Sequence, residues 1–415
     1  MPSKVIVIGG GAAGLMAAGA AAESGAEVLV IEKNAALAKK IRISGKGRCN
    51  LTNAVPIAEF IASYPGNGRF LYSALRQFTN QDLVAFFARY GVKTKVERGQ
   101  RVFPASDDAN QVAEALICYA REHGVRFRMN ESVTELCAKD GQIAEVRTNS
   151  GTYSTSRVIL ATGGASYPGT GSTGDGYRLA AAVGHTIIPP FPALVPLKTK
   201  ETWVQQVAGL TLKNVAATIT KGKDTRSAQT EFGEMLFAHF GVTGPIILTL
   251  SRQVGMWLRE GFPVTLSIDL KPALDESQLD QRIQRDFRQM QRKQFKNALG
   301  LLLPKSLIPV VVALSGVDPE KPVHQITRAE RQNLVKLLKG LQLSITGTLP
   351  LAAAIVTAGG VCVKEINPKT MESRLVKGLF FAGEVIDVDG VTGGFNLQAA
   401  FSTGRLAGIS AAAGN

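Results

Sequence analysis

Cysteine is scarce in this sequence, and its spacing excludes two kinds of site. Cys49, Cys118, Cys137 and Cys362 are scattered, and no two of them form the C-x-x-C pattern of a redox disulfide or of half a zinc site. We therefore expect no metal site. Four scattered thiols suit a reducing compartment, so the expected location is the cytoplasm.

Long apolar runs are also missing. The apolar stretches are interrupted by Gly, Glu or Lys at short intervals and fall short of the roughly 18 residues that a membrane helix needs. The opening residues MPSKVIVIGGG lead from one Lys through a short Val/Ile run directly into glycines, which is unlike a secretory signal. With 415 residues, 45% of them hydrophobic, the chain can bury a large core in two or three domains. We expect a soluble protein with no membrane partner.

Acidic residues are few relative to basic ones. The 33 Asp and Glu residues stand against 47 Lys and Arg, which gives a formal net charge of +14. Such an excess favours a polyanionic partner such as RNA. Alternatively, solubility and a phosphate-bearing ligand account for the charge, because many basic enzymes have no nucleic-acid partner.

Glycine, by contrast, is concentrated near the N-terminus in a pattern typical of dinucleotide binding. Residues 4 to 33 read as an apolar strand, a glycine turn, a small-residue helix and a second apolar strand ending at Glu32. Gly9, Gly11 and Gly14 supply G-x-G-x-x-G in the turn, where they allow a tight bend, a close approach of backbone amides to a pyrophosphate, and close helix packing. Glu32 is placed to accept hydrogen bonds from the adenosine ribose, which favours FAD or NAD over a 2′-phosphorylated nucleotide.

A second glycine-rich segment lies at residues 380 to 408. A buried strand delivers Gly383 and Glu384, where an acid can bind ribityl hydroxyls, and Gly393-Gly394 then leads into a helix beginning near Asn396. The small residues of this helix allow close packing, and its N-terminus, aimed at a flavin, would stabilise the negative charge of reduction. A close-packed core helix after a glycine turn is the alternative.

Between these segments the composition changes. Four prolines crowd residues 189 to 196, alternating patterns follow to about residue 270, and residues 275 to 340 are mostly helical, most clearly 279 to 296. We predict a discontinuous cofactor domain (1–190 with 355–415), a β-rich insertion (191–272 with 341–354) and a small helical domain (273–340).

The motifs taken together resemble the BaiN/RdsA family of bacterial flavoproteins. The resemblance covers nearly the whole chain and rests on GGGAAG, SGKGRCNLTN (44–53), ATGG (161–164), GTGSTGDGY (169–177), FAHFGVTGP (237–245) and GEVIDVDGVTGGFNLQAAFSTG. It implies an α/β fold: a Rossmann-like FAD-binding domain of the glutathione-reductase type, with an inserted β-barrel-like domain and a small helical domain. It also implies an NAD(P)H/FAD-dependent oxidoreductase.

The family fixes the cofactor better than the substrate. Similar proteins are linked to reduction of uridine to dihydrouridine in large-subunit ribosomal RNA, to reduction in a bile-acid pathway, and to amine oxidation. We favour reduction of a C=C bond in 23S ribosomal RNA, because of the net charge and an Arg-rich segment. The alternatives are a small-molecule reductase or amine oxidase, and an RNA-binding protein that keeps flavin structurally.

The resemblance and the motifs together predict the FAD contacts. They are Gly9, Gly11, Ala12, Ala13, Gly14, Glu32, Lys33, Gly45, Arg48, Cys49, Asn50, Val133, Ala161, Thr162, Gly163, Gly383, Glu384, Gly394, Phe395, Asn396, Leu397 and Gln398.

Two side chains are candidates for catalysis. By resemblance Cys49 would lie near the flavin ring, where a thiol with a pKa near neutrality can donate the proton that accompanies hydride transfer. Cys49 can equally be a small residue packed against the ring. His239, one of four histidines, can act as a second acid or order its glycine-containing loop.

Two basic groups bear on an RNA partner. Residues 39 to 48 include Lys40 and Arg42 and contain no acid, and Arg285, Arg288 and Arg292 follow helical spacing in the Arg-rich segment. Such a helix can follow a phosphate backbone. A solvated helix face is the other interpretation.

Overall fold

The computed structural model describes residues 2–222 and 224–413, which form two compact units. The first unit comprises residues 1–193 and 351–415, and the second comprises residues 194–350. The first thus draws on both ends of the chain. In the second unit, core side chains of the predicted β-rich insertion and of the predicted helical domain form one hydrophobic cluster. The division of this unit into two domains, with a boundary at residue 273, therefore stays a prediction.

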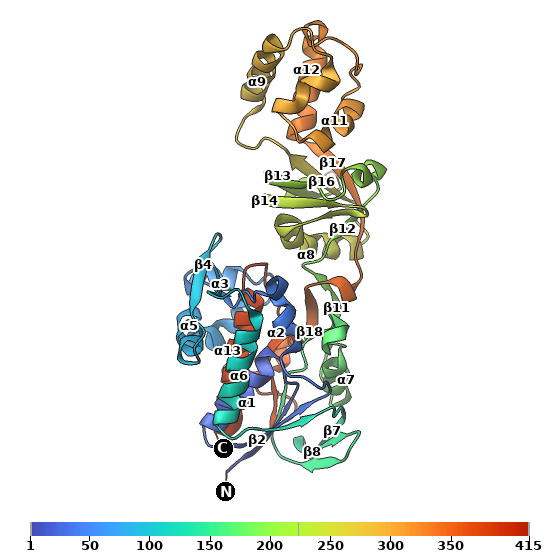
Figure 1. Ribbon diagram of the computed structural model, residues 1–415. Helices are drawn as coiled ribbons and strands as arrows, with labels where there is room; N and C mark the ends of the chain where they lie inside the picture. The colour runs from blue at the N-terminus through green and yellow to red at the C-terminus, as the bar shows by residue number, and fades with distance from the viewer. Residues whose placement is uncertain (1, 223, 414–415) are drawn as a thin grey trace. The chain divides into compact units, whose positions relative to one another are not determined.

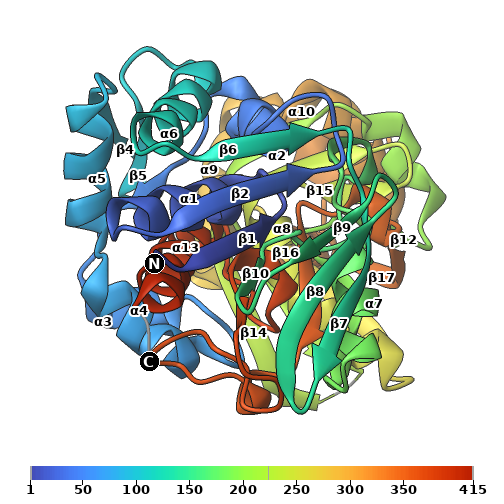
Figure 2. The ribbon, with the colours of Figure 1, turned by 90° about the horizontal axis from the view of Figure 1, so that it is seen from below.

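A five-stranded sheet forms the centre of the first unit (Figure 2). Its order is β19-β10-β1-β2-β6, and every pair is parallel. The strands are β1 (Lys4–Ile8), β2 (Glu27–Glu32), β6 (Arg126–Met129), β10 (Val158–Leu160) and β19 (Leu379–Phe381). Strands β1, β2 and β10 are continuous apolar runs whose apolar side chains are largely buried, as is typical of parallel strands covered on both faces.

Two small-residue helices cover this sheet. Helix α1 (Ala12–Glu23) follows β1, and α13 (Phe395–Ala412) is the last helix of the described chain. A Cβ added at Gly404 would lie 2.4 Å from the Ala13 carbonyl oxygen, and one at Gly408 would lie 2.3 Å from that of Ala17. The glycines therefore let the two helices touch through their backbones, which brings the N-terminal and C-terminal motifs together.

Smaller elements surround the sheet. An antiparallel meander holds β7 (Val133–Lys139), β8 (Gln142–Thr148) and β9 (Thr152–Ser154), and a second small sheet holds β3 (Thr52–Asn53), β4 (Thr94–Glu97) and β5 (Arg101–Pro104). Strand β11 (Ile187–Ala193) pairs with β18 (Val356–Val361). The main helices are α2 (Lys39–Ile43), α3 (Ile57–Ala62), α4 (Tyr72–Gln77), α5 (Asn80–Arg89), α6 (Ala109–Glu122) and α7 (Asp175–Ala182).

Two segments of this unit change structure along their length. The segment 39–53 begins with the short helix α2 and ends in β3. Residues 72–89 are divided between α4 and α5, because Thr79 caps α5 through a reciprocal pair of hydrogen bonds with Asp82 and so starts a new helix.

The second unit is built on a closed barrel with the strand order β12-β15-β14-β13-β16-β17 (Figure 1). Its strands are β12 (Leu197–Thr199), β13 (Thr211–Lys221), β14 (Asp224–Ala238), β15 (Gly241–Thr243), β16 (Val264–Asp269) and β17 (Leu341–Thr348). The helices are α8 (Pro245–Arg259), α9 (Glu276–Gln289), α10 (Phe295–Ala298), α11 (Ile308–Ser315) and α12 (Arg328–Lys339). The barrel-like insertion is therefore confirmed.

The helix predicted over 279–296 is too long. Helix α9 ends at Gln289, and Phe287 and Phe295 pack with ring centroids 6.4 Å apart. In a continuous helix these residues would be separated by about 12 Å along the axis, so the chain turns back between them. Arg292 lies in that turn, off the helix that carries Arg285 and Arg288.

Candidate functional site

The glycine turn after β1 shows why each glycine is needed. Gly9 has φ +104°, a conformation that favours glycine. A Cβ at Gly14 would lie 1.8 Å from the Gly9 carbonyl oxygen, so only glycine lets α1 start this close to the strand. At Gly11 a Cβ would meet no atom within 4 Å, because this backbone faces open space. The predicted tight turn and close packing are both present.

Glu32, at the end of β2, is only 7% exposed and fixes this turn. Its Oε2 accepts a hydrogen bond from the Gly10 amide at 2.7 Å, and its Oε1 accepts one from the Asn34 amide at 2.8 Å. One carboxylate thus joins the glycine turn to the chain beyond β2. It also lines the pocket described next.

A pocket in the first unit runs from this turn to the start of α13. Of the predicted FAD contacts, those that line it are Gly9, Gly11, Ala12, Ala13, Glu32, Lys33, Val133, Ala161, Thr162, Gly163, Gly383, Glu384, Asn396 and Leu397. The pocket therefore brings together residues nearly 390 positions apart in sequence, from both glycine-rich segments. Lining residues that the sequence did not single out include Lys39, Asn34, Ser172, Asp175, Ile355 and Thr403.

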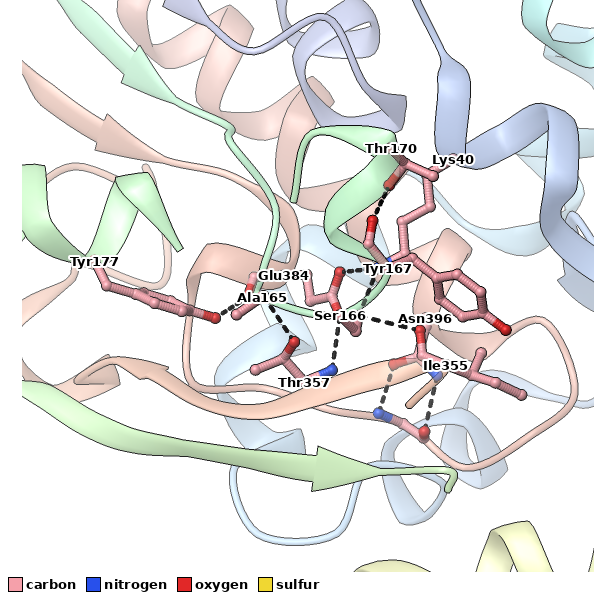
Figure 3. Close-up of polar contacts among 11 residues, drawn as sticks. Lys40, Ala165, Ser166, Tyr167, Thr170, Tyr177, Ile355, Thr357, Glu384 and Asn396 are labelled. Carbon is pink, nitrogen blue, oxygen red and sulfur yellow. Dashed lines mark hydrogen bonds and ion pairs between the residues drawn. The ribbon is translucent and has the colours of Figure 1, made fainter. Parts of the chain in front are cut away.

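Glu384 is the centre of a polar network in the pocket (Figure 3). Its Oε2 lies 2.8 Å from Lys40 Nζ, and its Oε1 accepts from the Thr357 amide at 2.7 Å and lies 3.2 Å from Ser166 Oγ. Burial alone would raise the pKa of Glu384, but Lys40 and these hydrogen bonds hold the pKa below its ordinary value. The carboxylate is therefore charged at neutral pH.

Lys40, predicted as an RNA contact, lies in this network. Its ammonium bonds Ser166 Oγ at 2.8 Å as well as Glu384, so it faces into the pocket. Arg42 is also engaged, with its guanidinium on Asn110 and Glu114 of α6. A prediction from charge spacing could not see these acids, because they come from distant parts of the chain.

The pocket fits a dinucleotide by its own geometry. Gly11 leaves open backbone at the N-terminus of α1, where amide dipoles favour phosphate. Lys39 and Lys40 add positive charge to the lining, and the start of α13 contributes Asn396 and Leu397 at the other end. Thr162, also in the lining, has a buried hydroxyl with no hydrogen-bond partner among the described residues. Such an orphaned polar atom is expected where a ligand completes the site.

Eight of the predicted FAD contacts do not line the pocket. They are Gly14, Gly45, Arg48, Cys49, Asn50, Gly394, Phe395 and Gln398. The amide of Asn50 donates to the Thr52 and Val102 carbonyls and accepts from the Gly394 amide. Gln398 is fully buried and bonds Thr52 Oγ1 at 2.6 Å. These amides brace the turn that precedes α13 against the 44–53 segment.

Arg48 and Cys49 are both held by contacts outside the pocket lining. Arg48 pairs with Glu97 and Asp107, and its guanidinium lies 4.3 Å from the centre of the Phe103 ring. Cys49 is fully buried in a hydrophobic cluster, and burial raises the pKa of its thiol to about 12. The burial and the raised pKa favour the packing interpretation. The proton-donor role stays a prediction.

The remaining predicted residues lie in the second unit. His239 is exposed in the turn between β14 and β15, where its ring packs on Phe240 with centroids 5.0 Å apart. Arg285 and Arg288 are exposed on α9, and Arg292 is exposed in the turn beyond it. Neither the catalytic role of His239 nor the RNA role of these arginines is tested by this geometry, and both stay predictions.

The fold and pocket define a Rossmann-type FAD-binding protein assembled from two distant glycine-rich segments. The chain belongs to the HI0933-like protein Rossmann domain family, whose model matches residues 3–410. It is 36% identical to the 3-dehydro-bile acid delta(4,6)-reductase of Clostridium scindens over 415 residues, 99% of each chain. It is 33% identical to the ribosomal RNA dihydrouridine synthase of Haemophilus influenzae over 415 residues, 98% of each chain.

A solved structure shows the same fold. The 3-ketosteroid delta1-dehydrogenase of Sterolibacterium denitrificans superposes with a TM-score of 0.53 at 15% identity, covering 98% of this chain and 99% of that one. The relatives support assignment of this chain to the FAD-dependent oxidoreductases. As for membranes, none of the helices in residues 2–222 and 224–413 is long and apolar enough to cross one.

Proposed function

We propose that this protein uses NAD(P)H and FAD to reduce a C=C bond in an unsaturated ring, with uridine in 23S ribosomal RNA as the favoured substrate. The observation that carries the oxidoreductase assignment is the pocket itself, which joins the phosphate-binding turn at Gly11 to the start of α13. FAD held by these residues would supply hydride-transfer chemistry, with NAD(P)H as the source of the hydride and an electron-poor ring carbon as its acceptor.

The two relatives share this chemistry although their substrates differ. Dihydrouridine is uridine with two hydrogens added across its ring double bond, and a delta(4,6)-reductase is named for reduction of ring double bonds. In the proposed reaction NAD(P)H would lose a hydride, one ring carbon would gain it, and the neighbouring carbon would gain a proton. The shared chemistry supports the reaction type more strongly than either substrate.

The residues of the pocket serve this reaction in different ways. Gly11 and the N-terminus of α1 would hold the pyrophosphate, and Glu32 the ribose end. The N-terminus of α13 places the positive end of a helix dipole in the lining, where it would stabilise negative charge that develops on reduction. Glu384 holds Lys40 in position through their ion pair.

The case for RNA rests on charge in the second unit. Arg285 is 64% exposed, and Arg288 follows it by three residues on α9, so both guanidinium groups lie on one helix face. Together with the net charge of +14, this face offers phosphate contacts. A small-molecule reductase remains the second candidate, since the bile-acid enzyme is 36% identical.

The test combines turnover and binding. Purified protein supplied with NAD(P)H and a fragment of 23S ribosomal RNA should yield RNA heavier by two hydrogen atoms, read by mass spectrometry. Arg285→Glu with Arg288→Glu should weaken binding of the fragment and flatten the salt dependence by roughly 1.4 to 1.8 log–log units, since each phosphate contact contributes about 0.7 to 0.9.

A matched double reversal provides the control. Arg121 and Arg226 are exposed arginines elsewhere in the chain, and changing both to Glu alters the net charge equally. This variant should bind RNA almost as tightly as the wild type. If both double variants weaken binding equally, α9 is no specific RNA contact. If the wild type forms no dihydrouridine but reduces a bile-acid enone, the small-molecule function holds.

A further inference from the structure

Tyr167 has an unusual backbone for a large aromatic residue. Its φ of 50° and ψ of 61° place it in the left-handed region, which residues with bulky side chains rarely adopt. It occupies this conformation immediately before a short 3-10 turn at Pro168–Thr170. Residues held in such strained conformations cluster at functional sites, where the surrounding structure over-determines them.

The chain on both sides of Tyr167 is held by hydrogen bonds. Just before it, Ser166 is fully buried and its Oγ lies 2.8 Å from Lys40 Nζ and 3.3 Å from the Ile355 carbonyl oxygen. Just after it, the amide and hydroxyl of Thr170 both donate to the Tyr167 carbonyl, at 2.9 and 2.8 Å. The backbone is therefore fixed on both sides of Tyr167, and on the Ser166 side it is fixed by the network that contains Glu384.

The Tyr167 side chain is partly exposed to solvent. Tyr167 is 40% exposed, and its hydroxyl has no hydrogen-bond partner among the described residues. In Figure 3 the ring projects toward the side of the network where Ile355 and Asn396 lie, and both of those residues line the pocket. Ile355 is itself 41% exposed. Two large apolar side chains are therefore held in contact with solvent beside the cofactor pocket.

We propose that Tyr167, together with Ile355, is a substrate-binding site: the two side chains provide an apolar face against which the flat unsaturated ring of the substrate packs. The inference rests on the proposed function. Aromatic side chains bind planar rings through their faces with little dependence on sequence or substituents. The shared chemistry is a flat, conjugated carbonyl ring, supplied either by a uracil base of RNA or by a polycyclic enone. The strained backbone keeps the ring in place before the substrate arrives.

The inference is tested by equilibrium dialysis of wild type and variants with two probes. One probe is a uridine-containing RNA hexamer and the other is a 3-oxo-4-ene steroid. Tyr167→Ala should weaken binding of the preferred probe by roughly 5- to 150-fold, the range of base–aromatic stacking. Tyr167→Phe keeps the ring and should stay within about threefold of the wild type. The probe whose affinity depends on Tyr167 identifies the source of the ring.

Tyr167→Gly separates binding from folding. Glycine adopts the left-handed conformation without penalty, so this variant should melt at a higher temperature than Tyr167→Ala while losing the same affinity. If the Tyr167 ring served only to stabilise the fold, the two variants would be less stable than the wild type but would bind the probes with unchanged affinity. Tyr72→Ala is the control, because Tyr72 is 47% exposed on α4 and should leave binding unchanged.

Two outcomes overturn the inference: the affinity of Tyr167→Ala equals that of the wild type for both probes, or the wild type binds neither probe. The proposed function fails in a different way. Dialysis measures affinity whether or not the protein carries FAD. If the protein retains no flavin but still binds a probe through Tyr167, the proposed FAD-dependent reduction is contradicted and the binding face of Tyr167 and Ile355 is supported.

Discussion

Replacing Lys40 with Met removes the ammonium that lies 2.8 Å from Glu384 and keeps a chain of similar length. The side chains of this pair are 30% and 20% exposed. Exposed ion pairs contribute at most about 1 kcal/mol, and removal of one partner from a fully buried pair costs roughly 3–5 kcal/mol. A partly buried pair falls between them, so we expect Lys40→Met to cost about 2 kcal/mol of unfolding free energy.

Thermal unfolding of the flavin-free protein measures this cost. About 2 kcal/mol corresponds to a melting temperature lower by roughly 4–8 °C for a domain of this size. Lys39→Met is the matched control, because among the described residues Lys39 Nζ contacts only the neutral oxygens of Asn34 and Gly169. It should lower the melting temperature much less.

A double-mutant cycle with Glu384→Gln isolates the pair. The two substitutions together should cost less than the sum of the single costs, with a coupling of about 1 kcal/mol or more. Additivity within about 0.3 to 0.5 kcal/mol would refute the ion pair as a source of stability. The pH dependence has a definite sign: because the pKa of folded Glu384 is lowered, the stabilisation is present above the unfolded value of about 4.3 and is lost as pH falls through the folded value.

Three further predictions concern other residues. Cys49→Ala should retain flavin and keep substrate-dependent reoxidation within about threefold in stopped-flow kinetics, whereas a loss of a hundredfold would restore the proton-donor role. His185 is buried between Glu365 and Ser373, and burial lowers its pKa. The wild type should therefore lose stability relative to His185→Gln as pH falls below about 6.5, by at most about 1.4 kcal/mol per pH unit. An equal difference in urea stability between the two proteins at pH 8 and pH 5 would contradict this. Gly14→Ala should lower the melting temperature strongly, because the added Cβ would lie 1.8 Å from the Gly9 carbonyl oxygen. Gly151→Ala is the control and should not lower it, because its Cβ would meet open space. Equal melting temperatures would show that α1 can move away from Gly9.

The parts of the fold that the sequence predicts well are those in which local pattern and tertiary role agree. The apolar strands β1 and β2, the turn at Gly9 and the small-residue helix α13 each carry a local signal that the structure reproduces. The cofactor pocket follows from them, because both glycine-rich segments must meet for one dinucleotide to contact both.

The errors arise where distant residues decide the outcome. Spacing alone places Lys40 with the basic surface, but Glu384, 344 residues later, draws its ammonium into the pocket. The burial of Cys49 in a core built from several helices likewise has no local signal. The end of α9 depends on the contact of Phe287 with Phe295, which a helical pattern cannot reveal. Thr357 and Ser166 were missed because hydroxyl residues are common and only the network singles them out.

The most direct test of the account is the flavin that the protein carries. Gly11 has extended backbone angles and open space at its Cβ, so Gly11→Val should fold normally while its side chain occupies the phosphate end of the pocket. Purified wild type should be yellow and release FAD on denaturation, and Gly11→Val should be colourless with an unchanged circular dichroism spectrum. Release of FMN as the only flavin, or equal FAD content in folded Gly11→Val, would contradict the two-ended pocket.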